Sequence, residues 1–395
     1  MTYSVLASAV NHPDAINPYI GLFNQRIVQS LMRRGMDVDV VSPRPYAPPV
    51  GPHSEFSMLP TVEGWNGYDV HHPRFFYLLP KRFFYGRAGE SFAKRVPRYV
   101  EKTFDVPDVV HACHIYLDGY GMVDYCERHD VPLFVVSHGH FMNNYDELAD
   151  DVRTKVDETL AAATKVLCVS DALAEKASER VSPDKVEVVP IGATPSRYPV
   201  ERKAELREEL GIDPEATVAL FVGEFCERKG IPELVEILPE LDLPNTEFVF
   251  VGHGGDEEWN LRRALASSQF SARHLYTGIT SMALRRWLAV ADVLVLPSHA
   301  EGRPTVIYEA MAAETAVLST TVGGIPEQVV DGETGVLIPP GDVERLREEL
   351  VAASADRDRL LEMGKKGRER LLEQGWTWDD HAERVRRLHT EALDR

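Results

Sequence analysis

Cysteine is scarce in this sequence, and long apolar runs are missing. The chain has 395 residues and only 4 cysteines, which are widely spaced and form no C-x-x-C pair. This argues against a disulfide framework and against a zinc ribbon, so we expect reduced and mostly buried thiols. No apolar stretch reaches the roughly 18 residues that a membrane-spanning helix needs, and MTYSVLASAV at the start lacks a basic region. The sequence therefore predicts neither a membrane span nor a secretory signal, and we expect a cytoplasmic protein.

Lysine is scarce as well, while acidic residues are abundant. The sequence contains 11 lysines beside 32 arginines, and its formal net charge is -19 at pH 7. Nucleic-acid binding is disfavoured, because nucleic acids are recognised by basic surfaces. An acid-rich, lysine-poor surface keeps a protein dissolved at high salt, so we expect a halophilic source, with coding bias toward arginine as the alternative explanation.

The length favours two domains of roughly 150 to 200 residues, since one hydrophobic core rarely supports so long a chain. In the first half, short β-branched runs alternate with amphipathic segments, which is typical of parallel strands joined by helices. We expect an N-terminal Rossmann-like domain over residues 1–195. Its strands are predicted at 3–10, 37–43, 108–112, 132–138, 165–170 and 185–190.

The same alternation restarts after a linker at 191–201. A second Rossmann-like domain is expected over residues 200–375. Its strands are predicted at 218–225, 247–254, 274–278, 292–298 and 316–323. The last helix, at 378–395, has no strand of its own to cover, so we expect it to pack back on the first domain. The predicted fold class is α/β, with two doubly wound domains facing each other across a cleft, where open parallel sheets bind ligands.

The segment LPSHAEGRPTVIYEAMAA, at 296–313, combines a buried strand, a polar loop and the start of a helix. Pro304 stands where the helix would begin, and proline is favoured at the first helical position. We expect the free amides around Arg303, Pro304 and Thr305 to bind a phosphate or a sugar hydroxyl.

Two glutamates flank this helix start. Glu301 precedes the helix and Glu309 lies inside it, so one is placed to reach a sugar while the other reaches a ribose diol, which carboxylates bind through paired hydrogen bonds. The alternative is that both are ordinary solvated acids. That alternative is weakened because Glu309 lies at the edge of an apolar helix face, where an unpaired charge is costly. The face consists of Val306, Ile307, Ala310 and Met311.

Several further motifs occur in a fixed order around this segment. They are VSHG at 136–139, VVPIGATPSRY at 188–198, VGEFCERKG at 222–230, VGHGG at 251–255, ADVLVLPS at 291–298, Glu301-x7-Glu309 and GGIPE at 323–327. VGHGG or GGIPE alone is weak, but the ordered set is specific. On these motifs nearly the whole chain resembles the retaining glycosyltransferases of family 4, which have the GT-B architecture.

The resemblance implies that the N-terminal domain, 1–195, binds the acceptor and that the C-terminal domain, 200–375, binds the nucleotide-sugar donor. It also implies a role for individual residues. Lys229 is expected to contact the donor diphosphate, Glu309 the ribose and Glu301 the transferred sugar. His138 would line the sugar pocket from the N-terminal domain. Gly21 resembles the glycine-rich turn that approaches the diphosphate, although no second glycine adjoins it here.

One position departs from the family pattern. Members usually have an arginine at the position that Glu224 occupies here, and a carboxylate cannot bind diphosphate. Arg228 is placed to restore this charge beside Lys229, or it simply faces solvent. The departure leaves open a degenerate partner subunit without activity. The shared architecture also leaves open a GT-B enzyme of another class, such as a nucleotide-sugar epimerase, although the epimerase motifs are absent.

For the mechanism, the family transfers sugar with retention, and no side chain here stands out as a covalent nucleophile. We therefore expect front-face substitution, in which the helix amides and Lys229 stabilise the charge that grows on the leaving phosphate. Neither a tightly bound cofactor nor a metal is expected to be required.

Histidines gather in HACH, at 111–114. A lone H-x-x-H on a strand-to-loop segment has poor ligand geometry, so a metal site is the less favoured interpretation. The longer pattern H-x-x-H-x-x-x-D-G, at 111–119, resembles transferases of the teichuronic-acid and colanic-acid type. This resemblance implies that His111, His114 and Asp118 position the acceptor.

Residues 74–102 concentrate aromatic and basic side chains in an otherwise acidic chain. Such a surface can dock on anionic lipid and receive a lipid-linked acceptor, with Lys81, Arg82 and Arg87 supplying charge. The alternative, given equal weight, is that the aromatic residues pack into the core and the arginines pair with nearby acids.

Together these patterns predict a glycosyltransferase of the hexosyltransferase type, placed in the cytoplasm or at the inner face of the membrane. It would move a sugar from a nucleotide-diphosphate sugar to a lipid-linked or polysaccharide acceptor, in surface glycan or glycoprotein glycan assembly. Three choices stay open at this point: the donor nucleotide, the sugar and the acceptor.

Overall fold

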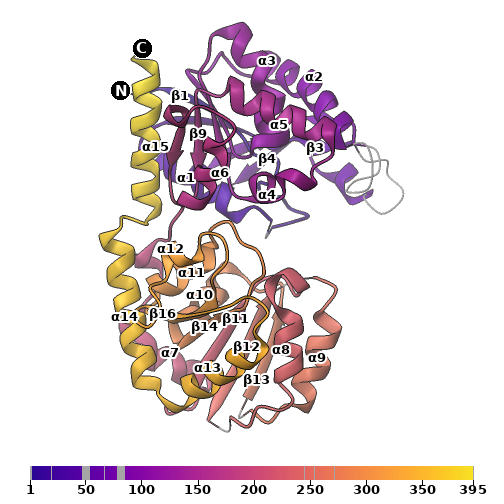
Figure 1. Cartoon of the computed structure of the whole chain (residues 1–395). Helices are drawn as coiled ribbons and strands as arrows, with labels where there is room; N and C mark the ends of the chain where they lie inside the picture. Colours follow the sequence, from indigo (N-terminus) through magenta and orange to yellow (C-terminus); the bar gives the residue numbers. More distant parts are fainter. Residues whose placement is uncertain are drawn as a thin grey trace. The chain divides into compact units, whose positions relative to one another are not determined.

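The computed structural model describes residues 2–18, 20–46, 54–65, 67–77, 85–243, 245–252, 254–270 and 272–394. The chain forms two α/β units (Figure 1). The first comprises Met1–Ile191 and Trp378–Arg395, and the second comprises Gly192–Thr377. The first limit falls close to the predicted boundary at 195, and the return to the first unit coincides with the predicted start of the last helix at 378.

The first unit is built on an eight-stranded sheet with the order β10-β9-β8-β7-β1-β2-β5-β4. Its strands are β1 (Ser4–Ser8), β2 (Asp37–Val41), β4 (Val62–Trp65), β5 (Tyr68–His71), β7 (Val109–Ala112), β8 (Leu133–Ser137), β9 (Lys165–Cys168) and β10 (Val186–Val188). Every neighbouring pair is parallel except β4 and β5. The chain builds the sheet outward from β1 in one direction and from β7 in the other, so the strand order reverses between β1 and β7.

The helices of this unit lie between its strands in the sequence, except the last one, which comes from the end of the chain. They are α1 (Leu22–Arg33), α2 (Tyr85–Thr103), α3 (Tyr120–His129), α4 (His140–Asn143), α5 (Asp150–Ala162), α6 (Asp171–Ser178) and the C-terminal α15 (Trp378–Leu393). The first helix shows why the sequence folds this way. Ile27, Val28 and Leu31 recur at helical spacing and are buried, and the helix ends just before Gly35, which has a φ of 83° that favours glycine.

The C-terminal helix α15 belongs to the first unit, where it lies beside α1 (Figure 1). Its His389 is fully buried and joins three parts of the unit. One ring nitrogen hydrogen bonds with the Tyr3 hydroxyl at 3.2 Å, and the other with His111 Nδ1 at 3.3 Å. The ring also packs edge-on against Phe134 at 4.5 Å between centroids. Strands β7 and β8 and the start of the chain are therefore all held to α15.

The second unit contains a six-stranded, fully parallel sheet with the order β13-β12-β11-β14-β15-β16. Its strands are β11 (Thr217–Val222), β12 (Thr246–Gly252), β13 (Ala272–Thr277), β14 (Val293–Leu296), β15 (Ala316–Thr320) and β16 (Gly335–Ile338). Its helices are α7 (Lys203–Leu210), α8 (Ile231–Ile237), α9 (Glu258–Ser267), α10 (Ser281–Val290), α11 (Thr305–Ala312), α12 (Ile325–Gln328), α13 (Val343–Ala355) and α14 (Arg357–Glu373). Strand order reverses between β11 and β14. Both units thus have the predicted Rossmann-like fold.

A buried carboxylate fixes the amino-terminal edge of this second sheet. Asp292, directly before β14, accepts hydrogen bonds from Arg207 at 2.6 Å and from the backbone amide of Val218 in β11 at 2.9 Å. Lys203 lies 3.1 Å from its other oxygen. Burial acts to raise the pKa of Asp292, but the attraction of Lys203 and Arg207 outweighs it, so the pKa is held below its usual range. The two strands at the reversal are therefore pinned together at their starts.

The four cysteines are free thiols, of which Cys113, Cys126 and Cys168 are buried, as expected from their spacing. Within the described parts of the chain, no helix combines the length and the apolar character that crossing a membrane requires.

Buried histidines make the first unit sensitive to acid. Burial lowers the pKa of His111 to about 3 and those of His12 and His381 to about 4. The unfolded chain protonates these groups near pH 6.5 while the folded chain does not, so stability is full above about pH 6.5 and falls as the pH drops toward 4. Each such histidine contributes a slope of up to about 1.4 kcal/mol per pH unit.

Urea unfolding of the full chain at several pH values between 7.5 and 4.5 measures this slope. We expect His381→Leu to flatten it and Leu393→Ala, which changes an exposed residue of the same helix that does not titrate, to leave it unchanged. Equal slopes for wild type and His381→Leu would contradict this account of acid sensitivity.

Candidate functional site

Two loops meet where the strand order of the second unit reverses. After β11 the chain makes a tight turn at Glu227–Lys229 and enters α8. After β14 it forms the loop 297–304 and enters α11. Open parallel sheets bind ligands in the crevice at the carboxyl ends of such neighbouring strands. This edge of the second unit is therefore the place to examine for chemistry.

Glycines bring these loops into backbone contact. Gly230 has a φ of 73°, and a Cβ on it would lie 2.0 Å from the carbonyl oxygen of Pro297. Gly323, after β15, has a φ of 54°, and a Cβ there would lie 2.0 Å from the carbonyl oxygen of Glu301. The Gly324 amide also donates to Gly302 O at 2.8 Å. Side chains at these glycines would push the loops apart, so the close packing requires glycine.

A lysine and a glutamate are paired across these loops. Lys229 Nζ donates to Glu301 Oε1 at 2.5 Å, and Ser298 Oγ donates to the same oxygen at 2.8 Å. The Glu301 side chain is 8% exposed and that of Lys229 is 15% exposed. This mostly buried ion pair joins Lys229, which was predicted to contact the donor diphosphate, to Glu301, which was predicted to contact the transferred sugar. Ser298, although part of the motif LPS, was not predicted to take part, because a single serine carries no signal of its own.

Arg228 lies between two carboxylates. One terminal nitrogen is 3.9 Å from Glu301, and the other is 3.9 Å from Glu224. Arg228 and Glu224 are both about half exposed. The charges of Lys229, Arg228, Glu301 and Glu224 balance, so these four side chains alone present no excess positive charge to an anion.

The start of α11 supplies further positive potential. Pro304 was predicted to be the first residue of the helix. The helix begins instead at Thr305, and Pro304 is its N-cap. Proline has no N–H, so the donors are the amides of Thr305 and Val306, which have no carbonyl within the helix to bind. Glu309 follows on the same helix and is half-buried. Among the three predicted residues at this helix start, Pro304 thus cannot donate a hydrogen bond.

The prediction for Arg303 concerned the backbone amides around it, and its side chain points into the unit. The side chain is 2% exposed, and its guanidinium donates to Glu327 at 2.8 Å, inside the unit. An arginine that is buried and paired in this way does not present its side chain to a diphosphate.

In the first unit, the reversal point between β1 and β7 carries a second cluster. The fully buried Asp118 accepts hydrogen bonds from Ser8 Oγ and the Val10 amide, both at 2.9 Å, and from His114 Nδ1 at 2.8 Å. The rings of His114 and His138 are 5.5 Å apart between centroids. The structure therefore brings together three predicted residues of this unit, His114, Asp118 and His138.

Phe23 and Gly21 lie at the same edge. Phe23, near the start of α1, packs on His138 with 4.5 Å between centroids. Gly21 precedes α1 with a φ of 70°. Burial and the nearby His114 hold the pKa of His138 well below its ordinary value, so this ring is neutral near pH 7. His111, in contrast, points to the other side: it is fully buried against His389 and does not contact this cluster's carboxylate.

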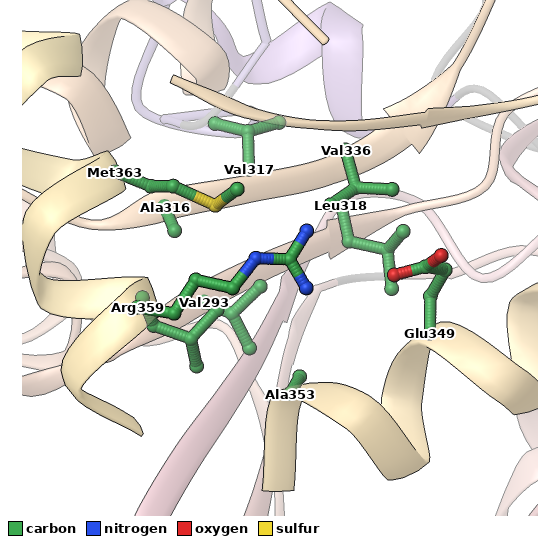
Figure 2. Close-up of a pocket in the computed structure, with 10 residues that line it drawn as sticks. Val293, Ala316, Val317, Leu318, Val336, Glu349, Ala353, Arg359 and Met363 are labelled. Atoms are coloured by element: carbon green, nitrogen blue, oxygen red, sulfur yellow. The ribbon is translucent and has the colours of Figure 1, made fainter. Parts of the chain in front are cut away.

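Figure 2 shows a small apolar cavity of the second unit that lies away from these loops. Most of its lining comes from aliphatic residues in the amino-terminal halves of β14, β15 and β16, and from α13 and α14. It encloses about 10 Å³, which is at most the room that one water molecule needs. We therefore regard it as a packing gap and not as a binding site. Across the ranges that the structure describes, no group of three or more histidine, cysteine or acidic residues is arranged to hold a metal ion.

Comparisons with known proteins identify the family of the chain. Residues 21–197 match the family described as Glycosyltransferase Family 4, and residues 202–370 match the family described as Glycosyl transferases group 1. The protein TuaC of Bacillus subtilis, whose name assigns it to teichuronic acid biosynthesis as a glycosyltransferase, is 30% identical over 346 residues, or 85% of each chain.

Two solved structures are similar over the whole length. Sucrose-phosphate synthase from Thermosynechococcus elongatus matches with a TM-score of 0.77 and 22% identity over 100% of both chains. HepE from Anabaena in complex with UDP-glucose matches with a TM-score of 0.71 and 15% identity over 99% of both chains. The chain belongs to the group 1 and family 4 glycosyltransferases and has the GT-B fold.

The close approach at Gly21 gives a matched pair of substitutions. A Cβ on Gly21 would lie 1.3 Å from Asn11 O, whereas Gly211, which also has a φ of 70°, has open space around it. We expect Gly211→Ala to cost about 1 kcal/mol and Gly21→Ala about 3 kcal/mol or more, because only the latter adds a clash to the unfavourable dihedral. Thermal or urea unfolding checks this order. Equal losses for the two variants would show that the turn before α1 tolerates a side chain.

Proposed function

We propose that this glycosyltransferase takes its sugar from a nucleotide-diphosphate sugar and that the Lys229–Glu301 pair marks the donor site. The observation that carries the proposal is the pair itself, a nearly buried ammonium and carboxylate at the point where strand order reverses. An ammonium there is a ready partner for phosphate oxygens. HepE, which shares the fold, was solved with UDP-glucose, and this supports the same donor class here.

The pair holds both groups in place before the donor arrives. A bound diphosphate would compete with Glu301 for Lys229, since Lys229 Nζ donates to Glu301 in the free protein. Glu301 would then accept hydrogen bonds from hydroxyls of the transferred sugar, with Ser298 still holding one oxygen. One ion pair is thereby replaced by two contacts with the donor.

The diphosphate needs more positive potential than the side chains supply, because the four charges of this cluster balance. The amides of Thr305 and Val306 at the start of α11 provide it without a counter-charge. Arg228, about half exposed, is able to turn toward the donor from its place between two carboxylates. In this arrangement Glu309, farther along α11, binds the ribose. The presence of Glu224 is then compatible with donor binding.

For the chemistry we propose front-face substitution with retention. The bond between the anomeric carbon and the phosphate oxygen breaks as the bond to the acceptor oxygen forms on the same face, and the acceptor proton passes to the leaving phosphate. Lys229 and the α11 amides stabilise the negative charge on that phosphate, which is electrostatic preorganisation. Neither a metal ion nor a bound cofactor takes part in this scheme.

The first unit would contribute to acceptor and sugar binding. Asp118 accepts only, so it fixes the N–H of His114 on Nδ1, and the other ring nitrogen is left for a hydroxyl. His138 stays neutral and so suits a hydroxyl rather than a phosphate. These two rings therefore favour an acceptor that presents sugar hydroxyls. A lipid-linked or polysaccharide acceptor, in surface glycan or glycoprotein glycan assembly, fits this chemistry and the naming of the relative TuaC.

Isothermal titration of UDP, GDP and ADP and of their sugar conjugates tests the donor site. We expect one nucleotide to bind selectively, and Lys229→Ala or Glu309→Ala to weaken it at least tenfold, because each loses a charged hydrogen bond of about 1.5–3 kcal/mol. Lys366→Ala is the matched control, since this lysine pairs with Glu362 on the exposed face of α14.

Absence of nucleotide binding by the wild type at both low and high salt would contradict the proposal and favour a degenerate partner subunit. Binding without release of nucleoside diphosphate in the presence of membranes and glycans would point to another GT-B enzyme class. Equal binding by wild type and Lys229→Ala would show that the donor site lies elsewhere in the protein.

We also propose peripheral contact with anionic lipid through α2. Its apolar face is buried around Phe92, while Arg87, Lys94 and Arg98 are exposed on the other face. Phe75 is buried, but Phe76 beside it is 49% exposed and lies under the guanidinium of another arginine of this helix. The aromatic residues are thus divided between core and surface. The predicted contributors Lys81 and Arg82 lie outside the described residues.

Vesicle co-sedimentation checks this surface. Changing Arg87, Lys94 and Arg98 together to glutamine should sharply weaken binding to vesicles with phosphatidylglycerol, because each exposed charge contributes about 1 kcal/mol near an anionic surface. The matched control changes three exposed basic residues of α14, Arg359, Lys365 and Lys366, to glutamine. If both triple variants sediment like the wild type, the lipid contact is wrong.

A further inference from the structure

Arg303 connects the loop of the proposed donor site to the interior of the second unit. Its guanidinium lies 4.9 Å from the ring centroid of Trp376 and 5.6 Å from that of Tyr308 in α11. It also donates to Glu327 in α12 at 2.8 Å. The side chain therefore leaves the loop inward, toward two aromatic rings and a carboxylate.

Trp376 is held from several directions. Arg370 covers its ring at 5.1 Å, and Tyr308 packs on it edge-on at 5.5 Å. Its carbonyl oxygen accepts the amide of Ala193 at 3.1 Å. Since the second unit runs from residue 192 to residue 377, Trp376 lies where the two ends of this unit are joined.

Glu327 lies close in sequence to the glycines that pack on the loop of Glu301. It belongs to the short helix α12, which follows Gly323 and Gly324, the residues packed on the backbone of Glu301 and Gly302. Arg370 donates to the backbone carbonyl of Glu327 at 3.0 Å. The loop, α12 and Trp376 thus form a closed set of contacts. Arg370 and Arg303 both touch α12 and the tryptophan, and Arg303 is the one of the two that belongs to the loop.

We propose that Arg303 is a positioning residue: it fixes the turn that presents Glu301 and the α11 amides, and it makes the environment of Trp376 depend on whether that turn is occupied. The inference rests on the proposed function for the part that concerns the donor. Arg303 does not contact the donor in this arrangement. Arginine suits this place because its planar guanidinium can pair with a carboxylate and stack on a ring at once, whereas lysine can do only the first well.

The first part of the test needs no ligand. Hydrogen exchange of the full-length free protein, read by mass spectrometry, compares the wild type with Arg303→Leu, Arg303→Lys and Arg347→Leu. The control arginine, Arg347, pairs with Glu240 at 2.7 Å and touches no residue of the turn. We expect amides of 298–306 to exchange at least tenfold faster in Arg303→Leu, less so in Arg303→Lys, and as in the wild type in the control.

The second part uses the nucleoside diphosphates UDP, GDP and ADP and follows tryptophan fluorescence. We expect the wild type to show a change on binding that Trp376→Phe removes and Arg303→Leu greatly reduces. Arg303→Leu should weaken binding about tenfold, with partial rescue by lysine.

The outcomes separate the two proposals. If the wild type binds no nucleotide, the donor site is wrong, while the exchange experiment still decides whether Arg303 positions the turn. If exchange of 298–306 is the same in Arg303→Leu as in the wild type, the positioning role is overturned even when nucleotides bind. A fluorescence change that persists in Trp376→Phe would overturn the link to the tryptophan.

Discussion

The salt bridge between Lys229 and Glu301 is the interaction on which the account of this protein depends. It forms because β11 and β14 are neighbours in the sheet although two strands, β12 and β13, and their helices separate them in the sequence. The loops after them can approach so closely because Gly230 has no side chain between the two backbones. Asp292 pins the same two strands at their opposite ends. The sheet thus places an ammonium and a carboxylate at the edge where ligands of such folds bind.

Much of this was predictable from the sequence. The run at 316–323 is mostly apolar and β-branched, which is typical of a strand buried on both faces, and it forms β15. The run at 37–43 alternates aspartate with valine at its start, which is typical of a half-buried strand, and it forms β2. The strand β16 escaped prediction because GVLI is short and lies between glycine and proline residues. The hairpin of β4 and β5 escaped because it lies at the polar edge of the sheet, where residues alternate weakly.

The candidate site was predictable in its residue types and less so in their directions. Lys229 and Glu301 lie in motifs whose order is specific, and their proximity follows from strand order. The side chain of Arg303 points inward, toward Trp376. Because Trp376 is distant in sequence, no local pattern predicts this direction. The same holds for His111, whose neighbour His389 comes from the C-terminal helix. A strand residue faces one side or the other by its parity, and His111 has the parity that faces α15, while His114 lies beyond the strand and reaches Asp118.

The most direct test of the central claim is a crystal structure of the protein with a nucleotide-diphosphate sugar. The account predicts diphosphate oxygens within hydrogen-bond distance of Lys229 Nζ and of the amides at the start of α11, with Glu301 moved from the lysine to the sugar hydroxyls. A diphosphate bound at another place, with the 2.5 Å bond between Lys229 and Glu301 still intact, would contradict it.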